Sequence, residues 1–303
     1  MWPLLETAID VPSSVAPEAI WAALTQMAAE DPSMSFGPER ETRQPVIRGQ
    51  DEAHLERLFE TLWTVHEIPA QWGPTLVCWR ETITRPAEIV AGYRGRSHTT
   101  QVAGVKLSFA KPATMVARVK LRFEPAKPGS GFVIDVADNA LPDAYRQAVV
   151  RALEWGRDNG VLIGAPMIDM TATLVEGDRN ADASVAAFEA ALREAFDELR
   201  DLGATVLLEP VMHVVIVTPA AFTGAIIADL DRRGATEIRS RDARDGTHID
   251  ALAPLSNLIG YRLSLGTLSN SRARLVLRYD HYAPVPDTPP PDDTFPGAVG
   301  KRA

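Results

Sequence analysis

The sequence lacks the features that mark several large classes of protein. Cysteine occurs once, at Cys78, in 303 residues, which excludes disulfide frameworks and cysteine-rich metal sites. No apolar run approaches the length of about 18 residues that a membrane-spanning helix needs. The first residues have no basic stretch followed by a long apolar one, so we expect no signal peptide. Together these absences predict a cytoplasmic protein.

What the chain does contain is an ordinary globular composition with an uneven distribution of charge. Hydrophobic residues make up 46% and charged residues 23%, and the length predicts two domains or three small ones. The net charge is −9, yet residues 94–127 hold eight basic residues and one acidic residue. Residues 257–279 contain four arginines and no acid. Basic faces on an acidic body suit a phosphate-rich partner, although charge alone fits a solvated strand face equally well.

Hydrophobic periodicity predicts the same order of elements at both ends of the chain. In each case the order is βαββαβ, which is the ferredoxin-like arrangement. The first module is predicted to have strands at 4–11, 33–36, 45–48 and within 75–83, with helices after Pro17 and around 55–63. The last is predicted to have strands at 211–217, 237–240, 247–252 and 274–282, with helices at 222–230 and 255–261.

The middle of the chain shows a different pattern. Residues 116–123 alternate, with apolar residues on one face and Arg118, Lys120 and Arg122 on the other. The sequence Pro128–Gly131 predicts a hairpin turn before a strand at 132–136. A helix follows around 145–153, then a long strand region at 161–175 that is broken near Gly164 and Pro166. Next comes a helix with one apolar stripe formed by Val185, Phe188, Leu192, Phe196 and Leu199.

Several short motifs occur in one order along the chain. They include Glu30-Asp31-Pro32, Gly49 with His54-Leu55-Glu56, Arg80-Glu81-Thr82-Ile83, His98 with Gln101, Pro128-Gly129-Ser130-Gly131-Phe132, Leu207-Leu208-Glu209-Pro210 and His281-Tyr282. Each is weak alone. Their order and spacing resemble the C-terminal three domains of bacterial elongation factor G, over nearly the whole chain.

The resemblance implies an α+β protein in which two ferredoxin-like βαββαβ modules flank an α/β module like the family's domain IV. The expected domains are 1–84 (domain III-like), 85–205 (domain IV-like) and 206–283 (domain V-like), followed by a proline-rich, mobile tail at 284–303. In the family, domain IV reaches the decoding site of the ribosome. The family's GTPase domain and the barrel after it have no counterpart here, and no G-x-x-x-x-G-K-[ST] motif occurs. We therefore expect no GTP hydrolysis by this chain, which is either a natural relative without the GTPase domain or a fragment of a longer elongation factor; only in the second case do we expect a GTPase.

Three segments depart from the family pattern. Residues 102–115 replace a glycine-rich tip loop and are longer than it, and Asn180 stands where a second tip loop normally offers a histidine. In the last module, residues 265–272 have lost one arginine and one glycine of the family's pattern. These changes make ordinary translocation doubtful but leave ribosome binding through basic faces possible.

Basic residues are the candidates for contact with an RNA backbone, because their charges add along a chain of phosphates. The candidates are Lys106, Lys111, Arg118, Lys120, Arg122, Arg179, Asn180, Arg262, Arg272 and Arg274.

For the other polar residues we prefer a structural role over a functional one. His54 with Glu52 and Glu56 imitates a metal or acid–base cluster, but the resemblance implies that this segment starts a structural helix. His213 lies in an apolar strand, and Asp169 is expected to make a structural hydrogen bond. We expect no catalytic residue, cofactor or metal.

The sequence thus predicts a translation-factor-like module that binds the ribosome through ribosomal RNA, without GTPase activity and with no membrane or DNA partner. Another translation factor is a further possible partner. The alternative is an interaction scaffold or regulator that has kept the fold and lost translocation function. A small-molecule enzyme is a third reading, against which the missing phosphate loop argues.

Overall fold

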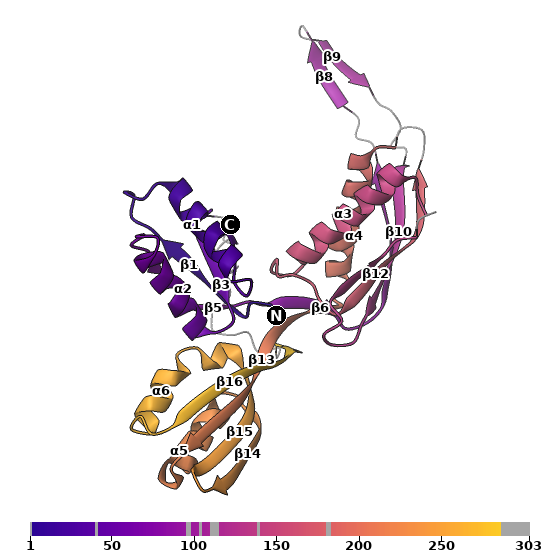
Figure 1. Cartoon of the computed structure of the whole chain (residues 1–303). Coiled ribbons are helices and arrows are strands. Elements are labelled where there is room, and N and C mark those ends of the chain that lie inside the picture. Colours follow the sequence, from indigo (N-terminus) through magenta and orange to yellow (C-terminus); the bar gives the residue numbers. More distant parts are fainter. Residues whose placement is uncertain are drawn as a thin grey trace. The chain divides into compact units, whose positions relative to one another are not determined.

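The chain folds into two compact units, seen in a computed structural model that describes residues 2–39, 42–94, 98–102, 105–109, 115–137, 140–179 and 183–285. Unit 1 is built from Met1–Trp79 together with Glu209–Ala283, and unit 2 from Arg80–Leu208 (Figure 1). The mixture of sheets and helices confirms the α+β class and the ferredoxin-like pattern at both ends. The proline-rich tail predicted at 284–303 lies outside the described residues from 286 onward.

The first half of unit 1 is an antiparallel sheet covered by two helices. Its α1 buries Ile20, Leu24 and Met27, as the periodicity predicts, and α2 begins where the Asp51 side chain accepts a hydrogen bond from the His54 backbone N–H. The sheet order is β2-β3-β1-β4, and β5 also pairs with β1. The elements are β1 (Leu5–Asp10), α1 (Pro17–Glu30), β2 (Ser35–Pro38), β3 (Pro45–Gly49), α2 (Glu52–Thr64), β4 (Gln71–Trp72) and β5 (Leu76–Val77).

The second half of unit 1 repeats this plan with the sheet order β14-β15-β13-β16. The helix predicted at 255–261 is wrong in its bounds, because Gly260 takes a left-handed conformation (φ 70°) that separates a 3-10 helix from α6. The elements are β13 (Thr205–Thr218), α5 (Ala220–Arg232), β14 (Thr236–Ala243), β15 (Gly246–Pro254), η1 (Leu255–Leu258), α6 (Tyr261–Leu268) and β16 (Arg274–Pro284).

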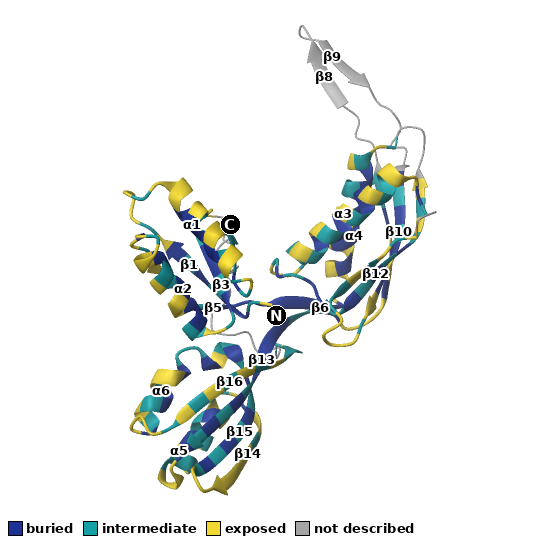
Figure 2. Cartoon of the chain, viewed as in Figure 1, coloured by how far each residue is buried: buried dark blue, intermediate teal, exposed yellow. Residues whose placement is uncertain are grey.

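Unit 2 is a four-stranded sheet of order β11-β12-β10-β7 with α3 and α4 side by side on one face. The inward residues of β10 and the apolar stripe of α4 form its core, which Figure 2 shows as the buried side of the sheet. The elements are β6 (Arg80–Ile83), β7 (Ala87–Arg94), β8 (His98–Val102), β9 (Val105–Phe109), β10 (Met115–Pro125), β11 (Phe132–Asp135), α3 (Asp143–Asn159), β12 (Met170–Arg179) and α4 (Val185–Asp201).

The strand predicted within 75–83 is in fact two strands with different partners. The short β5 pairs with β1, whereas β6 pairs with the start of β13, Ile83 opposite Thr205 and Arg80 opposite Leu208. The backbone of Glu81 bonds to another segment of unit 2, since its N–H donates to Pro166 O and its C=O accepts from Ile168 N. The segment from Arg80 onward is thereby held in unit 2.

Three local predictions in the middle of the chain are also wrong. The Gly129–Gly131 turn is no hairpin, because β12 lies between β10 and β11 in the sheet. The strand region predicted at 161–175 becomes a loop followed by β12, which starts only at Met170. The replaced tip segment, predicted as a loop at 102–115, contains β9, which pairs with β8 as an antiparallel hairpin.

Candidate nucleic-acid interface

The basic residues of β10 lie on the open face of the unit 2 sheet, as the alternation predicts. Ala117, Val119, Leu121 and Phe123 are fully buried against the helices. The intervening Arg118, Lys120 and Arg122 point to the opposite side, where their side chains are between 26% and 47% exposed. The helices leave this face of the strand uncovered, so the three cations are accessible to a ligand.

Each of these cations already has a carboxylate partner on a neighbouring strand. Arg118 Nη1 lies 3.2 Å from Asp178 Oδ2 of β12, while Lys120 Nζ and Arg122 Nη2 lie 2.8 Å and 3.2 Å from the two carboxylate oxygens of Glu88 on β7. Hydrogen bonds from Lys120 and then Arg122 hold the pKa of the Glu88 carboxyl below its ordinary range. A phosphate would therefore have to compete with these carboxylates.

The open face as a whole carries more negative than positive charge. The register of the four strands places Arg118, Lys120 and Arg122 on it with five carboxylates, counted over residues 87–93, 117–125, 132–135 and 170–178. These carboxylates belong to Glu88, Glu124, Asp135, Glu176 and Asp178. The net charge of +7 over residues 94–127 did not reveal these carboxylates, because most of them lie outside that segment.

Two of the remaining candidates of the middle domain lie in described strands. Lys106 lies in β9 opposite Gln101, and Arg179 lies at the end of β12 opposite Ala117. Lys111 and Asn180 fall outside the described residues.

The second basic group lies at the two ends of α6 in unit 1. Arg262 is in the first turn of α6, whereas Arg272 and Arg274 lie in and after the turn that leads to β16. All three are exposed, and among the described residues none of them forms an ion pair. The charge of Arg274 acts on Asp245, whose pKa is lowered first by a hydrogen bond from His248 and least by Arg274. These arginines are therefore available to an anion.

The turn after α6 forms a regular helix cap although Ser271 stands where the resemblance to the family implies a glycine. Ser271 N–H donates to Gly266 O at 2.7 Å and Asn270 N–H to Thr267 O at 3.4 Å, which is the pattern of a Schellman cap. Asn270 and Ser271 both take positive φ values, 50° and 59°. Ser271 occupies a conformation that glycine adopts without strain, so the turn before Arg272 forms at some cost in stability.

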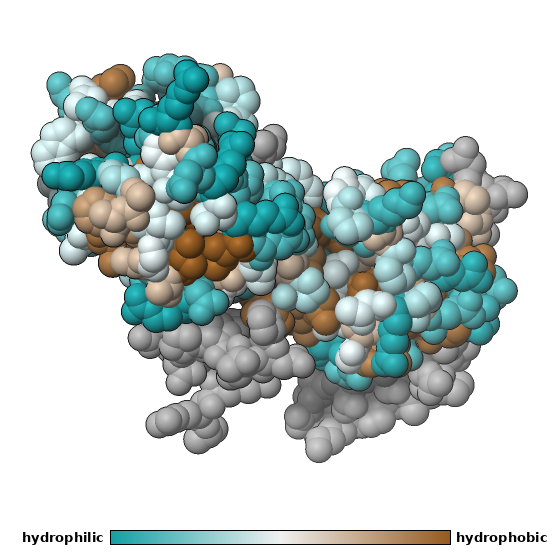
Figure 3. Space-filling view, turned by 90° about the horizontal axis from the view of Figure 1, so that it is seen from below, coloured by the Kyte–Doolittle hydropathy of each residue, from teal (hydrophilic) through white to brown (hydrophobic). Residues whose placement is uncertain are grey.

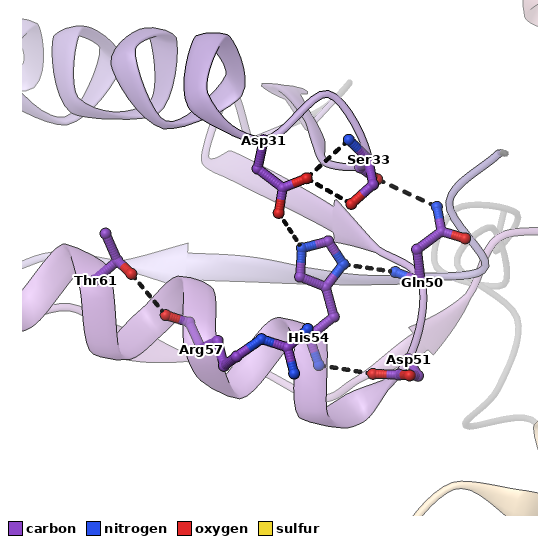
Figure 4. Close-up of polar contacts among 7 residues, drawn as sticks. All are labelled: Asp31, Ser33, Gln50, Asp51, His54, Arg57 and Thr61. Atoms are coloured by element: carbon purple, nitrogen blue, oxygen red, sulfur yellow. Dashed lines mark hydrogen bonds and ion pairs between the residues drawn. The ribbon is translucent and has the colours of Figure 1, made fainter. Parts of the chain in front are cut away.

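The cluster of His54 with Glu52 and Glu56 is structural. Figure 4 shows the partners of His54, which are Asp31, Gln50 and Asp51. His54 is 3% exposed; its Nδ1 accepts the Gln50 N–H at 3.1 Å, so Nε2 carries the proton and donates to Asp31 Oδ2 at 2.9 Å. Glu52 turns elsewhere and accepts the Gly260 N–H at 2.9 Å. The two residues thus have separate partners, and no shared acid–base site forms.

The Asp31 carboxylate gives this cluster a dependence on pH. Hydrogen bonds from the side chain and backbone of Ser33, and after them the interaction with His54, hold the pKa of the Asp31 carboxyl below the ordinary 3.8. Such a group contributes stability above its unfolded-state pKa and loses it as the pH falls through the lower folded-state pKa.

We expect Asp31→Asn to lower the free energy of unfolding by about 1 kcal/mol at pH 7 and by progressively less below pH ~4. Urea denaturation across pH would measure this, with exposed Glu60→Gln as control; a constant difference down to pH ~2 would contradict it.

A buried carboxylate that the sequence marked only as part of a motif organises unit 2. Glu81 is fully buried, and its two oxygens accept four backbone N–H groups of one loop. Oε2 accepts from Val161 at 2.6 Å and Leu162 at 2.9 Å, and Oε1 from Ile163 at 3.0 Å and Ala165 at 3.1 Å. The carboxylate shapes this loop and has no access to solvent, so we assign it a structural role.

The other polar residues singled out in the sequence are also structural. Asp169 accepts the Gly131 N–H at 3.0 Å, as expected of a structural hydrogen bond. His213 Nε2 lies 3.4 Å from Asp250 Oδ1 on the outer side of β13.

Among the described residues, no three His, Cys, Asp or Glu side chains gather to hold a metal ion. Within the same residues, every helix is too short or too polar to cross a bilayer. Figure 3 shows hydrophobic residues as separate patches on a largely hydrophilic surface.

Comparison with protein families gives three matches, in one order along the chain. Residues 2–74 match the model of Elongation Factor G, domain III; residues 76–202 match Elongation factor G, domain IV; and residues 206–292 match the Elongation factor G C-terminus. The three matches follow each other without overlap and together span almost the entire chain.

Individual relatives agree with these family matches. The chain is 37% identical over 290 residues to elongation factor G of Paracoccus denitrificans (strain Pd 1222), and 36% identical over 289 residues to that of Rhodopseudomonas palustris (strain BisB18). Both alignments cover 94% of this chain but only 39% and 40% of the relative, so the chain spans about two fifths of their length. A crystal structure of a protein from Thermus thermophilus matches with a TM-score of 0.62 and 26% identity, over 95% of this chain and 41% of that one.

Proposed function

The chain belongs to the elongation factor G family through its domain III, domain IV and C-terminal modules, and we propose on this basis that it is a translation-factor-like module that binds the ribosome. The observation that carries the proposal is the match of all three domains in order, at 37% identity over 94% of the chain. In this proposal the protein works in the cytoplasm, contacts ribosomal RNA and does not hydrolyse GTP.

The distribution of ion pairs supports one basic group over the other as the RNA contact. Arg118, Lys120 and Arg122 are paired with carboxylates, and their sheet face carries net negative charge. Arg262, Arg272 and Arg274 are exposed and have no such partners among the described residues. Phosphate contacts supply most of the affinity of such binding. We therefore propose that the arginines beside α6 contribute more to ribosome affinity than Arg118, Lys120 and Arg122 of β10.

Co-sedimentation with ribosomes across a salt series tests this ranking. We expect binding that weakens steeply with salt, and we expect Arg272→Glu with Arg274→Glu to weaken it by at least about tenfold at low salt, because two phosphate contacts are replaced by repulsion. Arg118→Glu with Lys120→Glu should have a smaller effect. Arg232→Glu is the matched control, because Arg232 is exposed and lies on α5 of the same half of unit 1.

Two outcomes would overturn parts of the proposal. Ribosome binding that the β10 variant abolishes and the Arg272/Arg274 variant leaves unchanged would reverse the ranking. Absence of binding at low salt would favour the alternative, a scaffold or regulator that retains the fold without the ribosome; a second translation factor would then be the partner to test.

A further inference from the structure

A groove lies on the surface of unit 2 between α3 and α4. It has a volume of about 260 Å³ and is lined by Arg151, Ala152, Trp155, Glu189 and Arg193. This volume lies just below the range of roughly 300–1,000 Å³ for sites that enclose drug-sized ligands. It gives room for one planar ring and a substituent.

The groove lies one helical turn from a point where α3 and α4 pack closely. At Gly156 the helices approach so closely that an added Cβ would lie 2.0 Å from Cζ of Phe196. One turn earlier on α3, the small Ala152 is buried and fills little space. The long side chains around Ala152 then form walls above a shallow floor.

Trp155 is the main wall of the groove and is 53% exposed. An indole face that is open to solvent can stack on another flat ring. Trp155 lies one turn from Arg151 on the same helix face, since residues four apart on a helix are neighbours. The aromatic surface is therefore bordered by a positive charge.

The two cations of the groove are weakly engaged. Arg151 Nη2 lies 3.9 Å from Glu189 Oε1, at the outer limit of an ion pair. Arg193 is exposed and has no ion pair among the described residues. A guanidinium binds phosphate through two parallel hydrogen bonds, and a carboxylate such as Glu189 accepts hydrogen bonds from the amino group of a base.

We propose that this groove binds a nucleotide: the base stacks on Trp155, its amino group donates to Glu189, and the phosphate binds Arg193 with Arg151 beside it. The same chemistry is offered by a free nucleotide and by an unpaired nucleotide of a single-stranded RNA. The site is separate from the arginines beside α6 and does not depend on ribosome binding.

Calorimetric titration of the full chain with GMP, with a short single-stranded RNA and with inorganic phosphate tests the site in the absence of ribosomes. Trp155→Ala should weaken nucleotide binding about 5- to 150-fold, and Trp155→Phe should restore most of it because the stacking ring is retained. Trp63→Ala is the control, because Trp63 is exposed to 60% in unit 1. Arg193→Glu should weaken binding, and Arg200→Glu, on the same helix outside the groove, should not.

The outcomes separate the two sources of the ligand and can refute the site. Equal affinity for GMP and RNA indicates a free nucleotide, and binding of RNA alone indicates an unpaired RNA base. No binding of either probe up to about 5 mM overturns the proposal. So does equal loss in the Trp155 and Trp63 variants, or phosphate binding as tight as GMP binding. Thermal melting of each variant verifies that unit 2 remains folded.

Discussion

Glu81→Gln is expected to lower the free energy of unfolding of unit 2 by about 3 kcal/mol or more. The carboxylate accepts four backbone N–H groups in a fully buried position. Glutamine offers only one acceptor oxygen. Its amide NH₂ would face backbone N–H groups of the loop, and these donors would then have no acceptor. Each unsatisfied buried donor costs about 1–3 kcal/mol, so the loss comes from the loop as well as from the substituted side chain.

Two measurements would verify this expectation. Urea denaturation gives the change in stability, and hydrogen exchange should show faster exchange at the amides of Val161, Leu162, Ile163 and Ala165, which donate to Glu81. Glu124→Gln is the control, because Glu124 is an exposed glutamate on β10 of the same unit and should change stability by less than about 0.5 kcal/mol. Unchanged exchange at the four amides in Glu81→Gln would refute the role assigned to the carboxylate.

Gly156→Ala is expected to destabilise unit 2 by about 1–3 kcal/mol. The new methyl group would overlap the ring of Phe196, whose Cζ and Cε2 lie 2.0 Å and 2.1 Å from the ideal Cβ position. This overlap forces α3 and α4 apart or moves the ring out of the core. Alanine favours a helix over glycine by about 1 kcal/mol, so a net loss means that the overlap outweighs the gain in helix propensity.

Gly224→Ala provides a matched comparison for this prediction. Gly224 also lies inside a helix, α5, but an added Cβ would meet nothing within 4 Å. With no overlap to oppose the gain in helix propensity, this variant should be more stable by up to about 1 kcal/mol. Thermal unfolding of the two variants should therefore shift in opposite directions. A shift of the same sign in both would mean that α3 and α4 are not held at the distance seen in the structure.

The local patterns of the sequence were sufficient to predict most elements and their buried faces. Alternation along 116–123 placed Arg118, Lys120 and Arg122 outward, and the apolar stripe of α4 is buried as predicted. These properties depend on periods of two and 3.6 residues, which neighbouring residues express directly. The ordered motifs likewise indicated elongation factor G, because they are read along one chain.

The errors lie where partners come from distant parts of the chain. The sequence predicted one strand within 75–83 and a hairpin at Gly129–Gly131, and the strand pairing contradicts both. Strand pairing depends on which edges meet in space, and no local signal fixes that. The break before α6 depends on a single left-handed glycine, Gly260.

By itself the sequence determined the family, the α+β class, the faces of the main elements and the two basic segments, since all of these are carried by residue order and periodicity. Only the tertiary structure decided how those charges are used. It paired the β10 cations with Glu88 and Asp178, left the arginines beside α6 without such partners among the described residues, buried Glu81 under one loop and opened a groove beside Trp155. The physical reason is that a charge acts on its neighbours in space, and folding chooses those neighbours.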